Sequence, residues 1–231
     1  MRDFTVTEQQ AQNLEVMTRG QHESPAWHRQ RQGRITASFV HDVKTLKSDT
    51  SRKSIVNKIL KIDQKNLSKI EAVKFGIKNE KVAKEQYKTQ MMNVHNNFTL
   101  RDSGLVVDTT CPFFAATPDG VRECSCHGSG LVEVKCVYKH KDQEISNIDD
   151  NTFYLEKDDL SLKKGHRYFT QVQFQMYVCS KTFCDFVVFT EKGIHIQTIN
   201  YDSDFVQELI EKCDSFVKND LLVEIIQRKL L

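Results

Sequence analysis

Two carboxylates and a lysine near the middle of the chain have the types and spacing that a metal-dependent hydrolase needs. Asp119 closes a short apolar run, and Glu133-Val134-Lys135 lies inside a second apolar run from Leu131 to Val137. Because strand side chains alternate between two faces, Glu133 and Lys135 share one face. A charge on a half-buried strand is costly unless it is paired or holds a metal ion. We therefore expect a hairpin that brings these groups together.

Asp119 and Glu133 suit Mg²⁺, which prefers oxygen ligands and takes one or two protein carboxylates besides substrate phosphates. Such an ion activates a water molecule and stabilises charge on a phosphoryl oxygen, while a nearby lysine positions the water or neutralises the reacting group. The pattern predicts phosphodiester hydrolysis. The alternative is an ordinary hairpin with Thr117-Pro118-Asp119-Gly120 as its turn, since Pro and Gly are common at those turn positions.

A third carboxylate lies on the longest helical pattern, from Ile70 to Met92. The apolar stripe of that pattern is predicted to contain Ile70, Val73, Ile77, Glu80, Ala83 or Lys84, Tyr87 and Met91. A carboxylate on such a stripe needs a cation or a metal ion, unless Glu80 lies at a partly exposed margin.

The segment from Trp27 to Ser38 carries groups that suit a phosphate monoester. Ser24-Pro25 predicts the start of a helix, Gly33-Arg34 its end, and Ile35 the start of a second helix. Arg31 and the Ser38 hydroxyl at that helix start could bind the phosphate. In the alternative, Ser38 only caps its helix and Arg31 faces solvent.

Other periodic segments predict the elements that must position these groups. Helices are expected within residues 1–22 (capped by Thr7), 54–62, 166–180, 202–217 and 219–229, and strands over 98–107, 113–116, 131–137, 183–190 and 193–199. In the helix over 166–180, Gln171 and Gln175 lie one turn apart beside Tyr168 and could hold a water molecule or the scissile phosphate, unless they are exposed. The acid-rich segment 138–160 is expected to be an excursion or a flexible loop near the active face. Together these elements indicate an α/β (α+β) protein.

Length and composition bound the remaining possibilities. A chain of 231 residues suits one domain, and it shows no apolar run long enough to span a bilayer and no secretory signal. We therefore expect an intracellular protein of a reducing compartment, nucleus or cytoplasm, with no membrane partner. The net charge is only +2, but ten Lys or Arg against three Asp lie between Trp27 and Lys65. This imbalance supports binding to a phosphate backbone, and the alternative is a solvated helical surface, which such runs usually form.

The seven cysteines include one cluster that could bind a metal ion. Cys124-Ser125-Cys126-His127, with Cys111 before it and Cys136 after it, offers soft ligands for a structural zinc. The Cys-x-Cys-His spacing matches no common zinc knuckle, and Gly128-Ser129-Gly130 predicts a tight turn beside it. We therefore expect a hairpin loop here rather than a zinc site.

The order of these groups resembles the phage lambda exonuclease family, also called the YqaJ-like viral recombinase domain, within the PD-(D/E)xK nuclease superfamily. The matching blocks are Trp27…Arg31…Ile35-Thr36-Ala37-Ser38, Gly76…Glu80…Tyr87, Thr117-Pro118-Asp119-Gly120, Glu133-Val134-Lys135-Cys136 and Tyr168…Gln171-Val172-Gln173…Met176. The resemblance implies a single nuclease domain over residues 1–231, with a restriction-endonuclease-like core (24–200) in which helices flank a central mixed sheet. An N-terminal helix (1–23) precedes this core and C-terminal helices (201–231) follow it.

The resemblance also implies an activity: metal-dependent 5′-to-3′ exonuclease action on linear double-stranded DNA ends that carry a 5′-phosphate, in recombination or DNA-end processing. The alternatives are an endonuclease or single-strand nuclease on the same core, or a DNA-binding domain without catalysis. The implied partners are duplex DNA ends, two further copies in a homotrimer, and a single-strand annealing protein.

The resemblance assigns roles residue by residue. Asp119, Glu133 and the Val134 carbonyl would bind Mg²⁺ or Mn²⁺, and Glu80 would lie near a second ion. Lys135 and Gln171 would be catalytic, with Tyr168 beside the substrate, and Arg31 and Ser38 would bind the 5′-phosphate. One departure from the named relative is Thr117, where that relative has serine.

Overall fold

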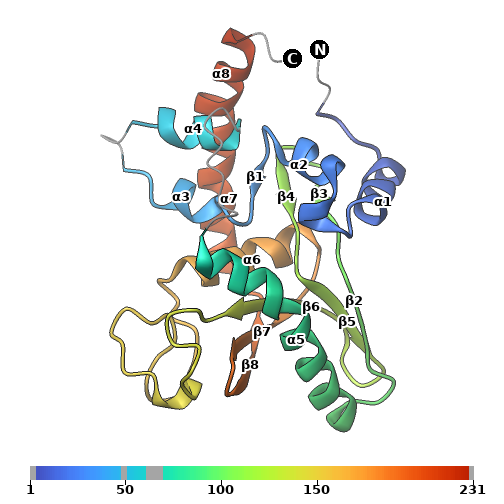
Figure 1. Ribbon diagram of the computed structural model, residues 1–231. Coiled ribbons are helices and arrows are strands. Elements are labelled where there is room, and N and C mark those ends of the chain that lie inside the picture. Colours follow the sequence, from blue (N-terminus) through green and yellow to red (C-terminus); the bar gives the residue numbers. More distant parts are fainter. Residues whose placement is uncertain (1–3, 48–50, 61–69, 229–231) are drawn as a thin grey trace.

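The computed structural model describes residues 4–47, 51–60 and 70–228. Figure 1 shows the elements in chain order: α1 (Glu8–Met17), η1 (Gln21–Glu23), α2 (Pro25–Arg31), β1 (Ile35–Thr36), α3 (Val40–Lys44), α4 (Lys53–Ile59), α5 (Glu71–Val94), β2 (Thr99–Arg101), β3 (Val106–Val107), β4 (Phe114–Ala116), β5 (Gly120–Cys124), β6 (Gly128–Cys136), η3 (Ile145–Asn147), α6 (Arg167–Val178), β7 (Phe183–Thr190), β8 (Gly193–Asn200), α7 (Ser203–Phe216), η4 (Val217–Leu221, a π-helix) and α8 (Leu222–Gln227). None of the helices in these ranges is long and apolar enough to cross a membrane.

A mixed five-stranded sheet forms the centre of the fold, in the order β2-β5-β6-β7-β8. Its neighbours are antiparallel except β6 and β7, which run parallel and are connected through a crossover that contains α6. A smaller sheet has the order β1-β4-β3. The expected α/β class with a mixed sheet flanked by helices is confirmed.

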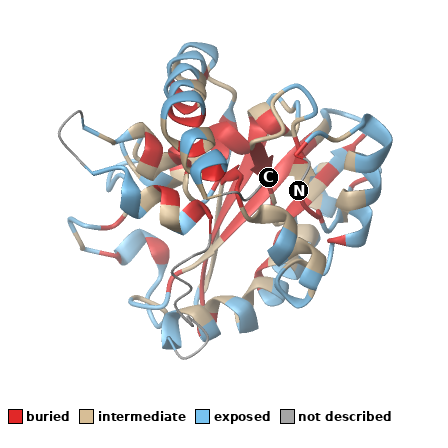
Figure 2. Cartoon of the chain, turned by 90° about the horizontal axis from the view of Figure 1, so that it is seen from above, coloured by how far each residue is buried: buried red, intermediate tan, exposed pale blue. Residues whose placement is uncertain are grey.

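The two faces of the sheet are covered by different helices, so each face of β6 has its own surroundings. Val132 and Val134 pack with Phe75, Ala83 and Tyr87 of α5, while Leu131 packs with Phe169, Val172 and Met176 of α6. Buried residues therefore concentrate on the central strands (Figure 2). The predicted alternation in β6 is confirmed, and it turns Glu133 toward α6.

Several elements agree with the prediction from sequence. The Thr7 side chain caps α1 in a capping box, and the Ser24 hydroxyl caps α2 with Pro25 at its first turn. The helix α6 and the β7–β8 hairpin also lie where the pattern placed them. The helix predicted over 54–62 corresponds to α4, although Ile62 lies outside the described residues.

Other predictions were wrong, and tertiary contacts explain why. The strand predicted over 98–107 is divided between β2 and β3, which lie in different sheets, because Gly104 passes directly against α1 and its N–H binds the Glu15 side chain. The helix predicted to start at Ile35 is preceded by strand β1, which pairs Ile35 with Phe114. In α5, Ala83 and Tyr87 of the predicted stripe are buried, but Phe75, outside that stripe, is also buried whereas Ile77 is 51% exposed.

The β5–β6 hairpin, the segment 138–160 and the C-terminal helices also differ from the prediction. Gly128-Ser129-Gly130 lies within β6 rather than in a turn, and β6 pairs with β5, a strand that the sequence pattern missed. The segment 138–160 contributes buried Ile145, Phe153 and Leu155 to the core on the α6 side. The two C-terminal helices join without a break through the π-helix η4, and the predicted last residue, Lys229, lies outside the described residues.

Candidate active site

Glu133 lies at the centre of the site and is held by three donors. Its side chain is only 3% exposed. Lys135 Nζ lies 2.5 Å from Oε1, Gln171 Nε2 donates to Oε1 at 2.5 Å, and Gln175 Nε2 donates to Oε2 at 2.8 Å. The two amides come from successive turns of α6, so one helix face supplies both. These contacts supply hydrogen-bond partners to both oxygens of a carboxylate that is otherwise buried.

Lys135 stays protonated in this arrangement. Burial of the ammonium lowers its pKa, but the charges of Glu133 and Asp119 raise the pKa by more, so it lies above its ordinary value. The ammonium also lies 4.7 Å from the centre of the Tyr168 ring. Tyr168 thereby covers one side of the lysine, where it limits the positions open to the cation.

Asp119 occupies the point where β5 begins. The β5–β6 pairing ends at Gly120 and Val132, and beyond it the Asp119 side chain accepts a hydrogen bond from the Val134 N–H at 2.7 Å. The pKa of Asp119 is raised well above its ordinary value, first by burial and then by the negative charges of Glu133 and Glu80. Asp119 is therefore part of one electrostatic group with the other two carboxylates.

Glu80 reaches the edge of this group from α5. Its side chain is 36% exposed and pairs with Lys84 at 2.8 Å, and Lys84 also contacts Asp102 at 3.1 Å. Glu80 and Asp119 both raise the pKa of Lys84 against the effect of burial. Glu80 therefore lies at a partly exposed margin, the alternative that the sequence left open, and in this structure its cation is a lysine one helical turn away.

These groups fit a divalent metal ion. Three carboxylates act on one another across the site, and burial together with Glu80 and Asp119 raises the pKa of the nearby Cys136 thiol to about 12. A local excess of negative potential of this kind is what a bound cation relieves. The Val134 carbonyl is a suitable further donor, because the N–H and C=O of one strand residue point to the same side and its N–H already faces Asp119.

Arg31 forms a second, separate polar pocket. Its Nη2 donates to Ser38 Oγ at 3.0 Å and to Thr36 Oγ1 at 3.4 Å, and the guanidinium stacks 3.8 Å from the Trp27 ring centre. Burial lowers the pKa of Arg31 to about 10, and its buried Nε has no hydrogen-bond partner in the described part of the chain. A buried cation surrounded by hydroxyl groups is suited to a phosphate. Ser38 does not cap α3, whose N-cap is Phe39, so the alternative in which Ser38 only caps its helix was wrong.

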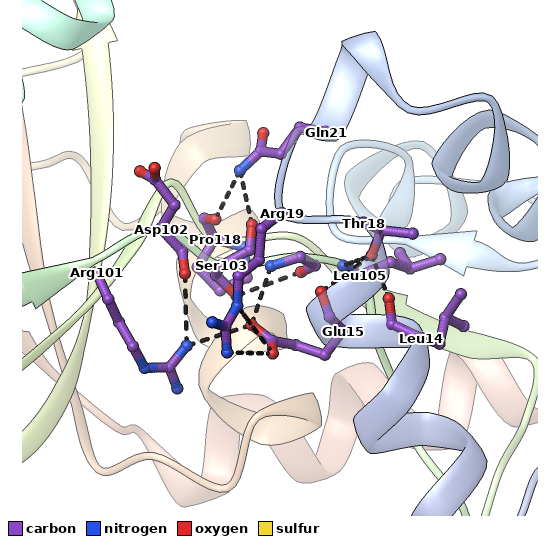
Figure 3. A network of polar contacts seen from close by, with 11 residues as sticks. Leu14, Glu15, Thr18, Arg19, Gln21, Arg101, Asp102, Ser103, Leu105 and Pro118 are labelled. Atoms are coloured by element: carbon purple, nitrogen blue, oxygen red, sulfur yellow. Dashed lines mark hydrogen bonds and ion pairs between the residues drawn. The ribbon is translucent and has the colours of Figure 1, made fainter.

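A chain of contacts connects this pocket to the carboxylates. Trp27 stacks on Arg31 and donates from Nε1 to Thr117 Oγ1 at 3.0 Å, two residues before Asp119. From η1, Gln21 Nε2 donates to the carbonyls of Ser103 at 3.0 Å and Pro118 at 3.2 Å (Figure 3). The N-terminal segment therefore holds the turn that presents Asp119.

Two functional candidates were missed in the sequence. Arg167 lies at the first turn of α6, where its Nη2 donates to the Ser38 carbonyl at 3.4 Å. A cation is unfavourable at a helix N-terminus, and this was the one signal that could have indicated it. Thr36 lies within the phosphate-like segment, and its hydroxyl bridges Arg31 and Ser38.

Fewer basic side chains of the N-terminal third are available to bind phosphate than the composition indicates. Arg34 is buried and donates to backbone carbonyls, Arg52 pairs with Asp220 at 3.2 Å, and Lys58 pairs with Asp42 at 3.5 Å. Lys61 and Lys65 lie outside the described residues. Arg31 is therefore the strongest candidate from that stretch.

A mixed sheet with paired carboxylates and a lysine at the open end of a central hairpin has the restriction-endonuclease-like fold. The chain belongs to the family of the YqaJ-like viral recombinase domain, whose model matches residues 26–182. The predicted family is confirmed.

Individual relatives agree with this assignment. The chain is 30% identical over 121 residues, 52% of its length, to the alkaline nuclease of human herpesvirus 7 (strain JI), and the match spans 22% of that protein. The alkaline exonuclease LHK-Exo from Laribacter hongkongensis has a TM-score of 0.63 at 23% identity, covering 88% of this chain and 96% of the other. The shutoff and exonuclease protein of Kaposi's sarcoma-associated herpesvirus has a TM-score of 0.59 at 13% identity, covering 91% and 73%. The same fold occurs in a SOX–DNA complex and a KSHV SOX–RNA complex.

Proposed function

We propose that this chain is a metal-dependent deoxyribonuclease that degrades linear double-stranded DNA from ends carrying a 5′-phosphate, in the 5′-to-3′ direction. One observation carries the proposal: Glu133, on the central strand of the sheet, is contacted at once by Lys135, Gln171 and Gln175, with Asp119 at the end of the paired strand. Structural proteins rarely bury this set of charges in one place, whereas nucleases need it.

The donor set determines what each residue does. Mg²⁺ or Mn²⁺ held by Asp119, Glu133 and the Val134 carbonyl, with Glu80 toward a second ion, would supply Lewis acidity at the scissile phosphate. Lys135, protonated and fixed between Glu133 and Tyr168, orients the attacking water and neutralises charge on the phosphate. Gln171 and Gln175 hold the Glu133 carboxylate in one orientation.

The preference for a DNA end follows from the Arg31 pocket. That pocket combines a guanidinium with no carboxylate partner in the described ranges and two hydroxyl groups, which suits the doubly charged phosphate at a 5′ terminus better than a phosphodiester. Since Trp27 joins the pocket to the turn before Asp119, a terminal phosphate bound there places the strand at a fixed distance from the carboxylates. This geometry supports end-directed cleavage over internal cleavage.

A groove beside Glu80 supports binding of a polyanion. It has a volume of about 580 Å³ and contains Arg19, Lys81, Lys84, Lys88 and Arg101, together with Glu23, Glu80, Glu85 and Asp102. The groove lies between η1 and α5, and Glu80 is the carboxylate of the site that lines it. The complex of a relative of this fold with DNA agrees with a DNA substrate.

A digestion assay tests the proposal. Wild type, Lys135→Ala and Arg31→Ala are given linear duplex DNA with 5′-phosphate or 5′-hydroxyl ends and closed circular DNA, with Mg²⁺ or with chelator. We expect wild type to degrade only linear DNA, only with metal, and phosphorylated ends faster; Lys135→Ala should lose at least about 100-fold in rate.

The Arg31 variant separates the pocket from the chemistry. Arg31→Ala should lose about 10-fold on phosphorylated ends and little on hydroxyl ends, because only the terminal phosphate loses its partner. Equal losses on both ends would contradict the pocket, and wild-type cleavage of circular DNA would indicate an endonuclease on the same core. Unchanged rates for Lys135→Ala would contradict the nuclease itself.

A further inference from the structure

Four metal-ligating side chains meet far from the carboxylates, at the outer end of the β5–β6 hairpin. They are His95, Cys124, Cys126 and His127, and their ligand atoms all lie within 4.8 Å of one another. Cys124 ends β5, Cys126 and His127 form the hairpin loop, and His95 is the C-cap of α5. Two thiols and two imidazoles are the ligand set of a common structural zinc site.

Three distances between ligand atoms of this cluster are close to those of tetrahedral zinc. With Zn–S and Zn–N bonds of about 2.3 and 2.0–2.1 Å, ligand atoms on a tetrahedron lie about 3.3–3.8 Å apart. The Cys126 and Cys124 sulfurs are 3.4 Å apart, His95 Nδ1 lies 3.3 Å from Cys126 Sγ, and His127 Nδ1 lies 3.9 Å from Cys124 Sγ. The two imidazole rings are nearly perpendicular, at 87°, so their nitrogens can converge on one point without stacking.

The surroundings hold the ligands in place without using them. The Ser125 N–H donates to the Asn96 carbonyl at 2.9 Å, and Asn97 Nδ2 donates to Ser125 Oγ at 2.9 Å, so the hairpin loop is already joined to the end of α5. Arg122 Nη1 lies 3.3 Å from Cys124 Sγ and can stabilise a thiolate there as an outer donor. Backbone and outer contacts of this kind usually accompany real metal sites.

We propose that His95, Cys124, Cys126 and His127 bind one structural Zn²⁺ ion. Four protein ligands complete the tetrahedron and leave no position for water, so the ion stabilises and does not catalyse. The site ties the C-terminal end of α5 to the β5–β6 hairpin (Figure 1). The helix α5 carries Glu80, and the hairpin carries Glu133 with Asp119 at its base. Zinc binding therefore fixes the position of α5, with Glu80, relative to the β5–β6 hairpin, with Asp119 and Glu133.

The sequence alone does not reveal this site, because one ligand, His95, lies far from the other three along the chain. His95 precedes Cys126 by 31 residues, so no local spacing pattern includes it. The expectation of a plain hairpin loop rested on the Cys-x-Cys-His spacing and on the tight turn predicted beside it, and the fold supplies the missing ligand.

Metal analysis of the full chain, purified under reducing conditions and dialysed against excess Mg²⁺, tests the proposal. Wild type should hold about one zinc ion per chain, and Cys126→Ser and His127→Ala, both exposed positions, should hold less than about a tenth of that. Cobalt(II) replacing the zinc should give the visible absorption of tetrahedral thiolate coordination in wild type and not in these variants. Thermal unfolding should shift downward on loss of zinc.

Matched controls separate this site from the catalytic one. Cys111→Ser and His22→Ala change the same residue types elsewhere and should keep the zinc. Asp119→Asn should also keep it. Wild type without stoichiometric zinc, or zinc retained by both Cys126→Ser and His127→Ala, would overturn the proposal. So would zinc lost from Asp119→Asn alone, because the metal would then belong to the carboxylates.

Discussion

At the scale of single residues, the site contains three carboxylates, Asp119, Glu133 and Glu80. Two cations lie beside them, since Lys135 pairs with Glu133 and Lys84 pairs with Glu80. Asp119, Glu133 and Lys135 could be predicted because they lie in two adjacent runs whose strand period is short and strict. Gln175 and Lys84 could be assigned no partner in advance, because their partners depend on how α6 and α5 dock on the sheet. Docking depends on tertiary contacts that local patterns do not contain.

Asp119→Asn should stabilise the protein without metal while abolishing its activity. Burial and two neighbouring carboxylates raise the pKa of Asp119, so its charged form costs stability at neutral pH, and this cost falls as pH drops and the group is protonated. The amide oxygen can still accept from the Val134 N–H. We expect a gain of about 1 kcal/mol in the free energy of unfolding in chelator, measured by urea denaturation.

Added metal should reverse the order of stability of Asp119→Asn and wild type. Added Mg²⁺ should raise the stability of wild type and leave Asp119→Asn almost unchanged, since binding to the native state alone stabilises it. Asp204→Asn, on the first turn of α7, is the matched control and should behave as wild type. A variant less stable than wild type in chelator would contradict the charge argument.

Gln175→Met tests the support of Glu133. The substitution keeps the volume of the side chain roughly constant but leaves Glu133 Oε2 without its 2.8 Å donor, so we expect a loss of about 1–3 kcal/mol in stability. Nuclease rates should fall in parallel because the carboxylate loses its fixed orientation. Gln207→Met, on the exposed face of α7, is the control and should change stability by less than about 0.5 kcal/mol.

At the scale of elements, prediction was right where one strong local pattern decides and wrong where distant segments decide. The caps of α1 and α2 and the β7–β8 hairpin follow from adjacent residues. Strand β1 has two residues and exists only because it pairs with β4. In α5, Ile77 is exposed although periodicity placed it on the apolar stripe, and Glu80 lies at the partly exposed margin of that stripe.

The start of α6 should make the protein sensitive to acid. His166 is the N-cap of α6 and accepts from the Tyr168 N–H, and its pKa is lowered to about 4, first by burial and then by His41, Arg167, Lys163 and Lys135. As pH falls from about 6.5, the ordinary value, the unfolded chain takes up a proton that the folded chain refuses. The stability that this residue contributes is therefore present above pH 6.5 and lost toward pH 4.

His166→Asn keeps a side-chain acceptor for the cap but removes the titration. Between pH 7 and pH 4.5, its melting temperature should fall less than that of wild type. His22→Asn, an exposed histidine in η1, should follow the wild-type curve. Parallel curves for His166→Asn and wild type would show that the acid sensitivity arises elsewhere.

At the scale of the whole molecule, the fold joins the Arg31 pocket, a group of carboxylates and a groove that both basic and acidic side chains line. The N-terminal segment links the first two through Trp27 and Gln21. The homotrimer, the annealing partner and the compartment stay predictions, because each lies beyond a single copy of the chain. Light scattering tests the first: a homotrimer has three times the 26.8 kDa mass of the chain.

The groove between η1 and α5 should carry part of the affinity for DNA. Lys81 and Lys88 line it without lying at the carboxylates, so the double variant Lys81→Ala/Lys88→Ala should weaken binding to all duplex sequences alike. Each lysine that no longer neutralises a phosphate reduces the steepness of log affinity against log salt by about 0.9, which gives a change of about 2 for the pair. Binding is measured by fluorescence anisotropy between low and physiological salt.

Lys192→Ala/Lys218→Ala removes the same charge from the β7–β8 turn and the C-terminal helices and should leave the slope near that of wild type. Equal slopes for both double variants would mean that the duplex approaches the carboxylates by another face.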